Sequence, residues 1–193
     1  MKKIFLVFLC LYILNFFLLS QEFHIEYSSD FKSKKIYNSN DELVYQLNEP
    51  EVRIHWEPRI VQNYLFFLTE SNKLIGVDLK TKKKKIIIKD VGDFAVSDDL
   101  KYICIGRIKK ELKNSIYTTV PEIYNIKTKK IISFKEIDFS FLKSEIGISS
   151  DILFCPEQNG FSVGYHWETS IHKFSFFISL DDFSIYKVKF NYE

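Results

Sequence analysis

The sequence predicts an all-β protein built from small antiparallel sheets. Ile, Val, Phe and Tyr are abundant, Ala is almost absent, and aromatic residues make up 17% of the 193 residues. This composition is typical of half-buried strands. Short runs of these residues recur between clusters of turn-forming residues, as they do in sandwiches, barrels and propellers. Residues 140–146 alone could form one or two helical turns.

The first residues predict export from the cytosol. Lys2 and Lys3 precede an apolar run over residues 4–19, and the first acidic residue is Glu22. A positive end followed by an apolar core and a polar exit is the order of a secretory signal peptide. We expect residues 1–20 to be this signal, with cleavage after Ser20.

Two alternatives to cleavage stay open. The apolar run of 16 residues is shorter than the roughly 20 that span a bilayer, yet it could be retained as a membrane anchor. A lipid anchor on Cys10 is the other alternative. In each case we expect residues 21–193 to form one β-rich domain that is periplasmic or extracellular, with attachment to the membrane where residues 4–19 are retained.

The charge balance of this domain argues against nucleic-acid binding. Two of the 27 basic residues are Lys2 and Lys3, so the rest of the chain carries 25 basic and 25 acidic side chains. Proteins that bind nucleic acids present clustered positive charge, which displaces counterions from the phosphates. We therefore expect no nucleic-acid partner.

Strand-forming runs account for most of the domain. They cover residues 42–47, 63–69, 73–78, 85–88, 101–106, 161–165, 173–180 and 184–190. Turns separate them at short intervals, and no low-complexity linker divides the chain. The sequence therefore shows no internal domain boundary.

A repeated hairpin pattern runs through these strands. Residues 77–82, 124–129 and 179–183 each read as a strand, a polar turn and the start of another strand. Aligning Leu79, Ile126 and Leu180 gives spacings of 47 and 54 residues. A second pattern, an acidic turn before an aromatic and aliphatic strand, occurs at residues 97–104 and again at 155–163.

Residues 94–102 and 77–81 resemble two features of β-propeller blades of the WD-repeat or periplasmic Tol type. The first is similar to the turn before the second strand of a blade, and the second to the hairpin between the third and fourth strands. The resemblance covers about residues 51–190, although no Trp-Asp pair ends a blade. It implies a stack of antiparallel sheets with three to four blades.

The resemblance divides the chain into blades. They are residues 51–89, 90–134 and 145–190, with a partial fourth at 23–49. Because propellers usually need four to eight blades to close, such a chain forms a small ring, an open stack or a fragment completed by self-association. A closed β-barrel or a sandwich is the alternative.

One short motif with ionisable groups, His-Trp-Glu, occurs twice, at residues 55–57 and 166–168. Trp can stack on a sugar, while His and Glu can transfer protons. This pattern predicts a hydrolase or carbohydrate-active enzyme that uses Glu57 or Glu168. The two copies do not occupy equivalent positions in the repeat, so a chance recurrence in Trp-containing strands is the simpler interpretation.

The remaining site candidates are few. His166 and His172 flank a predicted turn at residues 168–170, where Glu168 would be the nearest third metal ligand, but two ligands make a weak signature. Cys104 and Cys155 lie in apolar runs, which favours unpaired thiols over a disulfide. The lysines at 82–85 fit a solvated hairpin that blunts an edge strand, with binding to an anionic surface as the functional alternative.

Taken together, these patterns favour a binding or scaffold protein without catalytic activity. Its partner would be another protein or a component of the cell envelope, met through propeller-like loops. The sequence suggests no metal and no cofactor. The alternatives are the enzyme using Glu57 or Glu168 and a small barrel that binds an apolar ligand.

Overall fold

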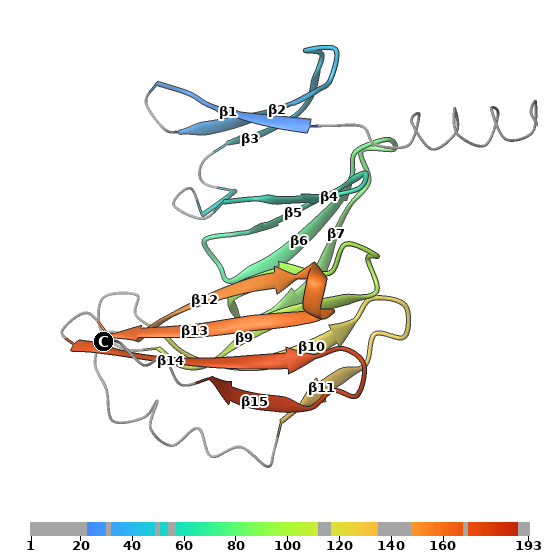
Figure 1. Cartoon of the computed structure of the whole chain (residues 1–193). Helices are drawn as coiled ribbons and strands as arrows, with labels where there is room; N and C mark the ends of the chain where they lie inside the picture. Colours follow the sequence, from blue (N-terminus) through green and yellow to red (C-terminus); the bar gives the residue numbers. More distant parts are fainter. Residues whose placement is uncertain are drawn as a thin grey trace, which may run out of the picture.

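A computed structural model of the chain describes residues 23–29, 32–48, 51–53, 57–111, 117–134, 148–167 and 170–188. In these residues the strands form four antiparallel sheets that follow one another along the chain (Figure 1). The first sheet has three strands and the other three have four each. Within every sheet the strands are neighbours in chain order, which is the simple meander that short hairpin turns produce.

The strand bounds follow the alternation of turn residues and β-formers. The first two sheets contain β1 (Phe23–Tyr27), β2 (Ser33–Asn38) and β3 (Leu43–Asn48), then β4 (Arg59–Val61), β5 (Tyr64–Leu68), β6 (Lys73–Asp78) and β7 (Lys84–Lys89). The third sheet contains β8 (Val91–Val96), β9 (Tyr102–Glu111), β10 (Tyr117–Asn125) and β11 (Ile131–Ser133). The fourth contains β12 (Ile148–Cys155), β13 (Gly160–Trp167), β14 (Ser170–Ser179) and β15 (Ile185–Val188), with the short 3-10 turn η2 (Pro156–Gln158) after β12.

This architecture confirms the predicted propeller-like stack of a partial sheet and three complete ones. No described strand pairs with a strand of another sheet, so the closed barrel is excluded. The first strands of the complete sheets lie next to one another, with β8 packed between β4 and β12. Each of the three complete sheets therefore extends outward from a shared inner edge, as a blade does.

Three hydrophobic cores fill the spaces between consecutive sheets. The first joins sheets one and two around Ile36 and Leu65. The second joins sheets two and three around Phe66 and Ile103. The third joins sheets three and four around residues such as Phe161. Because neighbouring residues of a strand face opposite sides, the central sheets contribute side chains to two cores at once.

The repeat found in the sequence has a structural counterpart. Leu79, Ile126 and Leu180 each donate a backbone hydrogen bond to the turn that follows the first strand of the same sheet. The acceptors are the carbonyl oxygens of Asn63, Lys101 and Asn159, at 2.8, 2.9 and 2.9 Å. The aligned residues are therefore equivalent positions of three blades, and the bond ties the outer hairpin of each blade to its inner hairpin.

One predicted turn differs from the structure by a residue, and two other predictions fall outside the described residues. Ser170, predicted in a turn, is the first residue of β14. The helical turns predicted at 140–146 and the signal at 1–20 lie outside the described residues. Among the described residues, which begin at position 23, no helix has the length and apolar character needed to cross a bilayer.

Candidate functional site

A pocket of about 340 Å³ lies at the inner edge of the three complete sheets. It is bounded by β4, β8 and β12 together with the segment before β4. Its lining residues are Glu57, Arg59, Asp93, Phe94, Asp151, Ile152 and Leu153. Three carboxyl groups and one guanidinium thus face an apolar wall, a combination suited to a small polar or cationic group.

Asp93 is the buried member of this group. Its side chain accepts hydrogen bonds from the backbone amides of Phe94 and Ile152, both at 2.7 Å. The strand is irregular just before it, because the pairing of β8 with β9 shifts between Val91 and Asp93. The extra residue is Gly92, where a Cβ would lie 2.7 Å from Cγ2 of Thr119. The glycine at this bulge therefore leaves room for the side chain of Thr119.

The surroundings of Asp93 change its acidity. Burial raises the pKa of Asp93 to about 7, and the negative charge of Asp151 acts in the same direction. The two backbone hydrogen bonds and the charge of Arg59 lower the pKa, but by less. A carboxyl group that titrates near neutrality can transfer protons. Here both of its oxygens are already bound by amides, which favours a structural role that joins two sheets.

Of the site residues predicted from the sequence, the structure describes only some. Glu57 does line the pocket, two residues before the start of β4. Its companions His55 and Trp56, and also Glu168, lie outside the described residues, as do the side chains of His166, Trp167 and His172. The metal site suggested by those histidines therefore stays a prediction. Among the residues that are described, no three His, Cys, Asp or Glu side chains gather to hold a metal ion.

The thiol of Cys104 is buried and is not an activated nucleophile. Cys104 and Cys155 are free thiols, the first buried and the second half-buried. Burial raises the pKa of Cys104 well above its usual value, and the charge of Asp93 adds to this effect. A thiol that stays protonated is a poor nucleophile.

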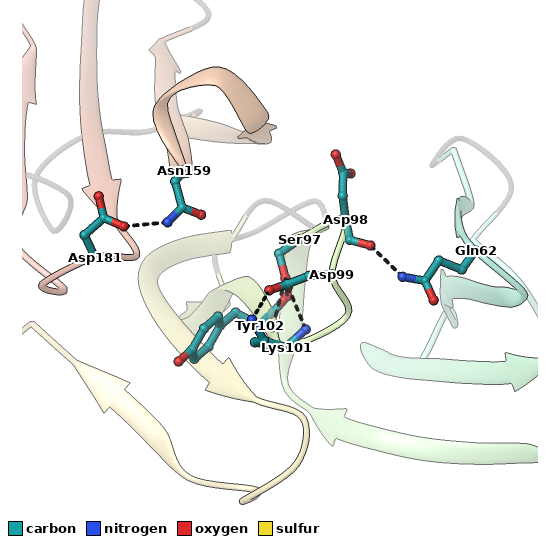
Figure 2. A network of polar contacts seen from close by, with 8 residues as sticks. All are labelled: Gln62, Ser97, Asp98, Asp99, Lys101, Tyr102, Asn159 and Asp181. Carbon is teal, nitrogen blue, oxygen red and sulfur yellow. Dashed lines mark hydrogen bonds and ion pairs between the residues drawn. The ribbon is translucent and has the colours of Figure 1, made fainter. Parts of the chain in front are cut away.

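A second polar feature lies where the strands turn at one rim of the stack. Figure 1 shows the turns β4–β5, β6–β7, β8–β9, β10–β11, β12–β13 and β14–β15 on the same side. Hydrogen bonds join them within and between sheets (Figure 2). Gln62 Nε2 donates to the carbonyl of Asp98 at 2.9 Å, and Asn159 Nδ2 donates to Asp181 Oδ1 at 2.6 Å. The first contact links the rim turns of sheets two and three, and the second joins two turns of sheet four.

The β8–β9 turn shows how such a turn is held. Ser97 Oγ donates to Asp99 Oδ1 at 2.8 Å and accepts a hydrogen bond from the amide of Tyr102 at 3.0 Å. Lys101 Nζ lies 2.8 Å from Asp99 Oδ2. Leu100 has a positive φ of 57° within this turn, a conformation that needs such support in a residue with a side chain. The rim turns are therefore fixed in shape.

No family model matches this sequence, and no curated protein matches it either. The fold, in contrast, is similar to solved propeller structures. They include the tricorn protease, with 14% identity, a TM-score of 0.53, and coverage of 81% of this chain and 16% of that one. The N-terminal domain of Nup159 gives 15% identity, a TM-score of 0.52, and coverage of 85% and 46%. The Dos1 propeller gives 12% identity, a TM-score of 0.51, and coverage of 86% and 44%.

These similarities establish the fold class and nothing more specific. The chain is a β-propeller-type protein that spans less than half the length of each of these three structures. Proteins with the propeller fold include both enzymes and binding proteins, so the fold does not show which of these two functions the chain has.

Proposed function

We propose that this protein is exported and binds a partner protein of the cell envelope through the turns on its rim, without catalysing a reaction. The observation that carries the proposal is the repeated hydrogen bond from Leu79, Ile126 and Leu180 to the inner turn of each blade. It fixes six turns from three sheets on one surface. A surface that is already ordered loses little conformational entropy when a partner binds.

A structural neighbour supports a protein partner. Nup159, which has a similar fold, is bound to Dbp5 in another solved structure that also contains Gle1. The similar fold supports a protein partner for this chain as well. Export is supported by the signal-like order of Lys2, Lys3 and the apolar run at 4–19.

Site-specific photo-crosslinking in the native host tests the binding surface. A photoreactive residue placed at Asp98 or Thr128, both exposed on the rim, should yield a covalent product with a partner protein. The same residue at Ser71, exposed on the turn at the opposite end of β5 and β6, is the matched control. Products that form from Ser71 and not from the rim would refute the proposal.

Export is tested separately with a reporter enzyme that is active only outside the cytosol. Fused after residue 193 of the whole chain, it should be active, and deletion of residues 2–20 should abolish that activity. Reporter activity that survives the deletion would show that these residues are not the export signal.

A second candidate function is the hydrolase or carbohydrate-active enzyme that uses Glu57. The placement of Glu57 in the pocket that also contains Asp93 and Asp151 favours it. In that case Glu57→Gln should abolish turnover of a glycoside substrate library while the rim still yields its crosslinked product. If the wild-type chain turns over none of the substrates, this candidate fails and the binding function stands.

A further inference from the structure

Two neighbouring sheets present the same four residues at the same place. Residues 80–83 in the β6–β7 turn and residues 127–130 in the β10–β11 turn both read Lys-Thr-Lys-Lys. Each follows an equivalent position of the repeat, Leu79 in one turn and Ile126 in the other. We refer to them as the two KTKK turns. The corresponding turn of the fourth sheet, residues 181–184, reads Asp-Asp-Phe-Ser instead.

The two KTKK turns share their backbone conformation as well. A side chain before each turn, Asp78 or Asn125, accepts a hydrogen bond from the amide of the threonine, at 3.1 and 2.8 Å. The third residue of each turn, Lys82 or Lys129, has a positive φ of 58° or 59°. The turns are thus two copies of one rigid shape, and their lysines project from equivalent points.

The KTKK turns keep a net positive charge within the described part of the chain, although the carboxylate of Asp78 attracts Lys80 at the base of the first turn. All six lysines are exposed, and none takes part in the ion pairs found among the described residues. Lys82 Nζ donates to the backbone carbonyl of Val44, which is an uncharged acceptor. A cluster of six such charges attracts an anionic partner from a distance, and the attraction weakens as salt is added.

The neighbouring turns restrict the shape of that partner. Asp98 and Asp99 stand on the β8–β9 turn of the same rim, while Asp181 and Asp182 stand on the β14–β15 turn. A flat anionic surface such as a bilayer would meet these carboxylates together with the lysines. A narrow chain that follows only the outer hairpins of sheets two and three would avoid them.

The chemistry of the lysines narrows the partner further. The rim turns that carry them contain no aromatic side chain on which a nucleic-acid base could stack, and the domain as a whole is neutral. Lysine is a compact point charge that interacts well with carboxylates without demanding a planar, two-pronged geometry. Both properties favour a flexible polypeptide that is rich in Asp and Glu.

We infer that the two KTKK turns together bind one extended acidic segment of the partner protein. This inference rests on the proposed binding function and names the site and the chemistry of its ligand. Two equivalent lysine clusters on one rigid body act as linked binding modules. Occupying one of them raises the effective concentration of the acidic segment at the other.

Fluorescence anisotropy with the full-length chain in detergent tests this inference. The probe is a labelled peptide of about 16 alternating Asp and Glu residues, long enough to extend roughly 50 Å. We expect saturable binding at low salt that weakens steeply as salt increases. Replacing Lys80, Lys82 and Lys83 by Gln should weaken binding about tenfold, and replacing both sets of three lysines should abolish it.

The matched control replaces Lys35, Lys73 and Lys89 by Gln, since these lysines lie outside the two turns and Lys73 pairs with Lys89 at the opposite end of sheet two. It should bind the probe as the wild type does. Equal loss in the control, or no loss when both KTKK turns are neutralised, would refute the inference. Lysine-dependent binding of single-stranded DNA that is tighter than binding of the peptide would also refute it. Lysine-dependent binding of anionic vesicles in preference to neutral vesicles would do the same. A crosslinked partner that is retained after both KTKK turns are neutralised would refute the inference alone and leave the proposed function standing.

Discussion

The carboxylate of Asp93 on β8 accepts a hydrogen bond of 2.7 Å from the backbone amide of Ile152 on β12. It is a direct polar link between the third and fourth sheets, whose other contacts are mainly apolar. The residues that reach each other are far apart in the sequence. Asp93 therefore holds the inner edges of the third and fourth sheets together at the wall of the pocket.

The stability of the protein should fall as the pH rises through neutrality, because of Asp93. Its pKa is raised to about 7 in the folded chain, so the folded state binds this proton where the unfolded state has already lost it. The contribution is fully present below the unfolded pKa, near 4, and is lost as pH rises through 7. The loss between pH 5 and pH 8 should be about 2 to 3 kcal/mol. Urea unfolding at several pH values measures it.

The control for this prediction is Asp93→Asn, which has no titrating proton. Its stability should depend less on pH than that of the wild type in the same range, although its absolute stability falls because one amide loses an acceptor. Other charged groups near Asp93, namely Arg59, Asp151 and Glu57, remain in both proteins. Parallel stability curves for the two proteins would contradict the assignment.

The sequence predicted the blades because their signals are local. The hairpins around Leu79, Ile126 and Leu180 combine a β-forming strand with a polar turn, and both are visible in a window of a few residues. The spacing of these hairpins then locates the sheets, so the predicted blades agree closely with the observed ones. The repeated hairpin does not occur in the first sheet, and the sequence predicted only a partial blade at residues 23–49, where the structure has β1, β2 and β3.

The pocket could not be predicted from the sequence because its lining residues come from three different sheets. Glu57 was singled out for its neighbours His55 and Trp56, which are outside the described residues. Asp93, Arg59 and Asp151 carry no motif, and their meeting depends on how the inner strands pack. One local signal was available in Asp93, a charged residue inside the otherwise apolar strand β8. Burial of a charge of this kind indicates a partner or a function.

The ion pair between Arg107 and Glu122 should be costly to break. Arg107 Nε lies 3.0 Å from Glu122 Oε2 across β9 and β10, and the two side chains are only 16% and 8% exposed. Glu122→Gln would leave the guanidinium charge largely buried without its anion. We expect a loss of about 2 to 4 kcal/mol in the free energy of unfolding, measured with urea.

Replacing both partners tests whether the cost comes from the stranded charge. The double variant Arg107→Met with Glu122→Leu should recover much of the stability lost in Glu122→Gln, because no charge remains to be desolvated. Glu157→Gln, at an exposed position of η2, is the single-site control and should change stability little. A double variant that is less stable than Glu122→Gln would show that the pair stabilises the fold in its own right.

The β8–β9 turn should depend on the hydroxyl of Ser97. The side chain is buried, donates to Asp99 and accepts from the amide of Tyr102. Ser97→Ala leaves that amide without its side-chain acceptor and should cost about 1 to 2 kcal/mol in urea unfolding. Ser71→Ala, in an exposed turn at the other end of the sheets, should cost much less. Equal costs would mean that the network in Figure 2 does not stabilise the turn.

Gly160 at the start of β13 should not tolerate a side chain. A Cβ at this position would lie 2.3 Å from Cζ of Phe177 and 2.5 Å from the carbonyl oxygen of Ile178. The backbone oxygen cannot yield as a side chain can, so Gly160→Ala should destabilise the protein by about 2 kcal/mol or more in urea unfolding.

Gly76→Ala is the matched control, because its Cβ would first meet the flexible end of Ile87, at 3.0 Å. Since alanine also restricts the unfolded chain, the cost of Gly76→Ala should stay below about 1 kcal/mol. Similar losses in the two variants would show that β13 and β14 do not pack this closely at Gly160.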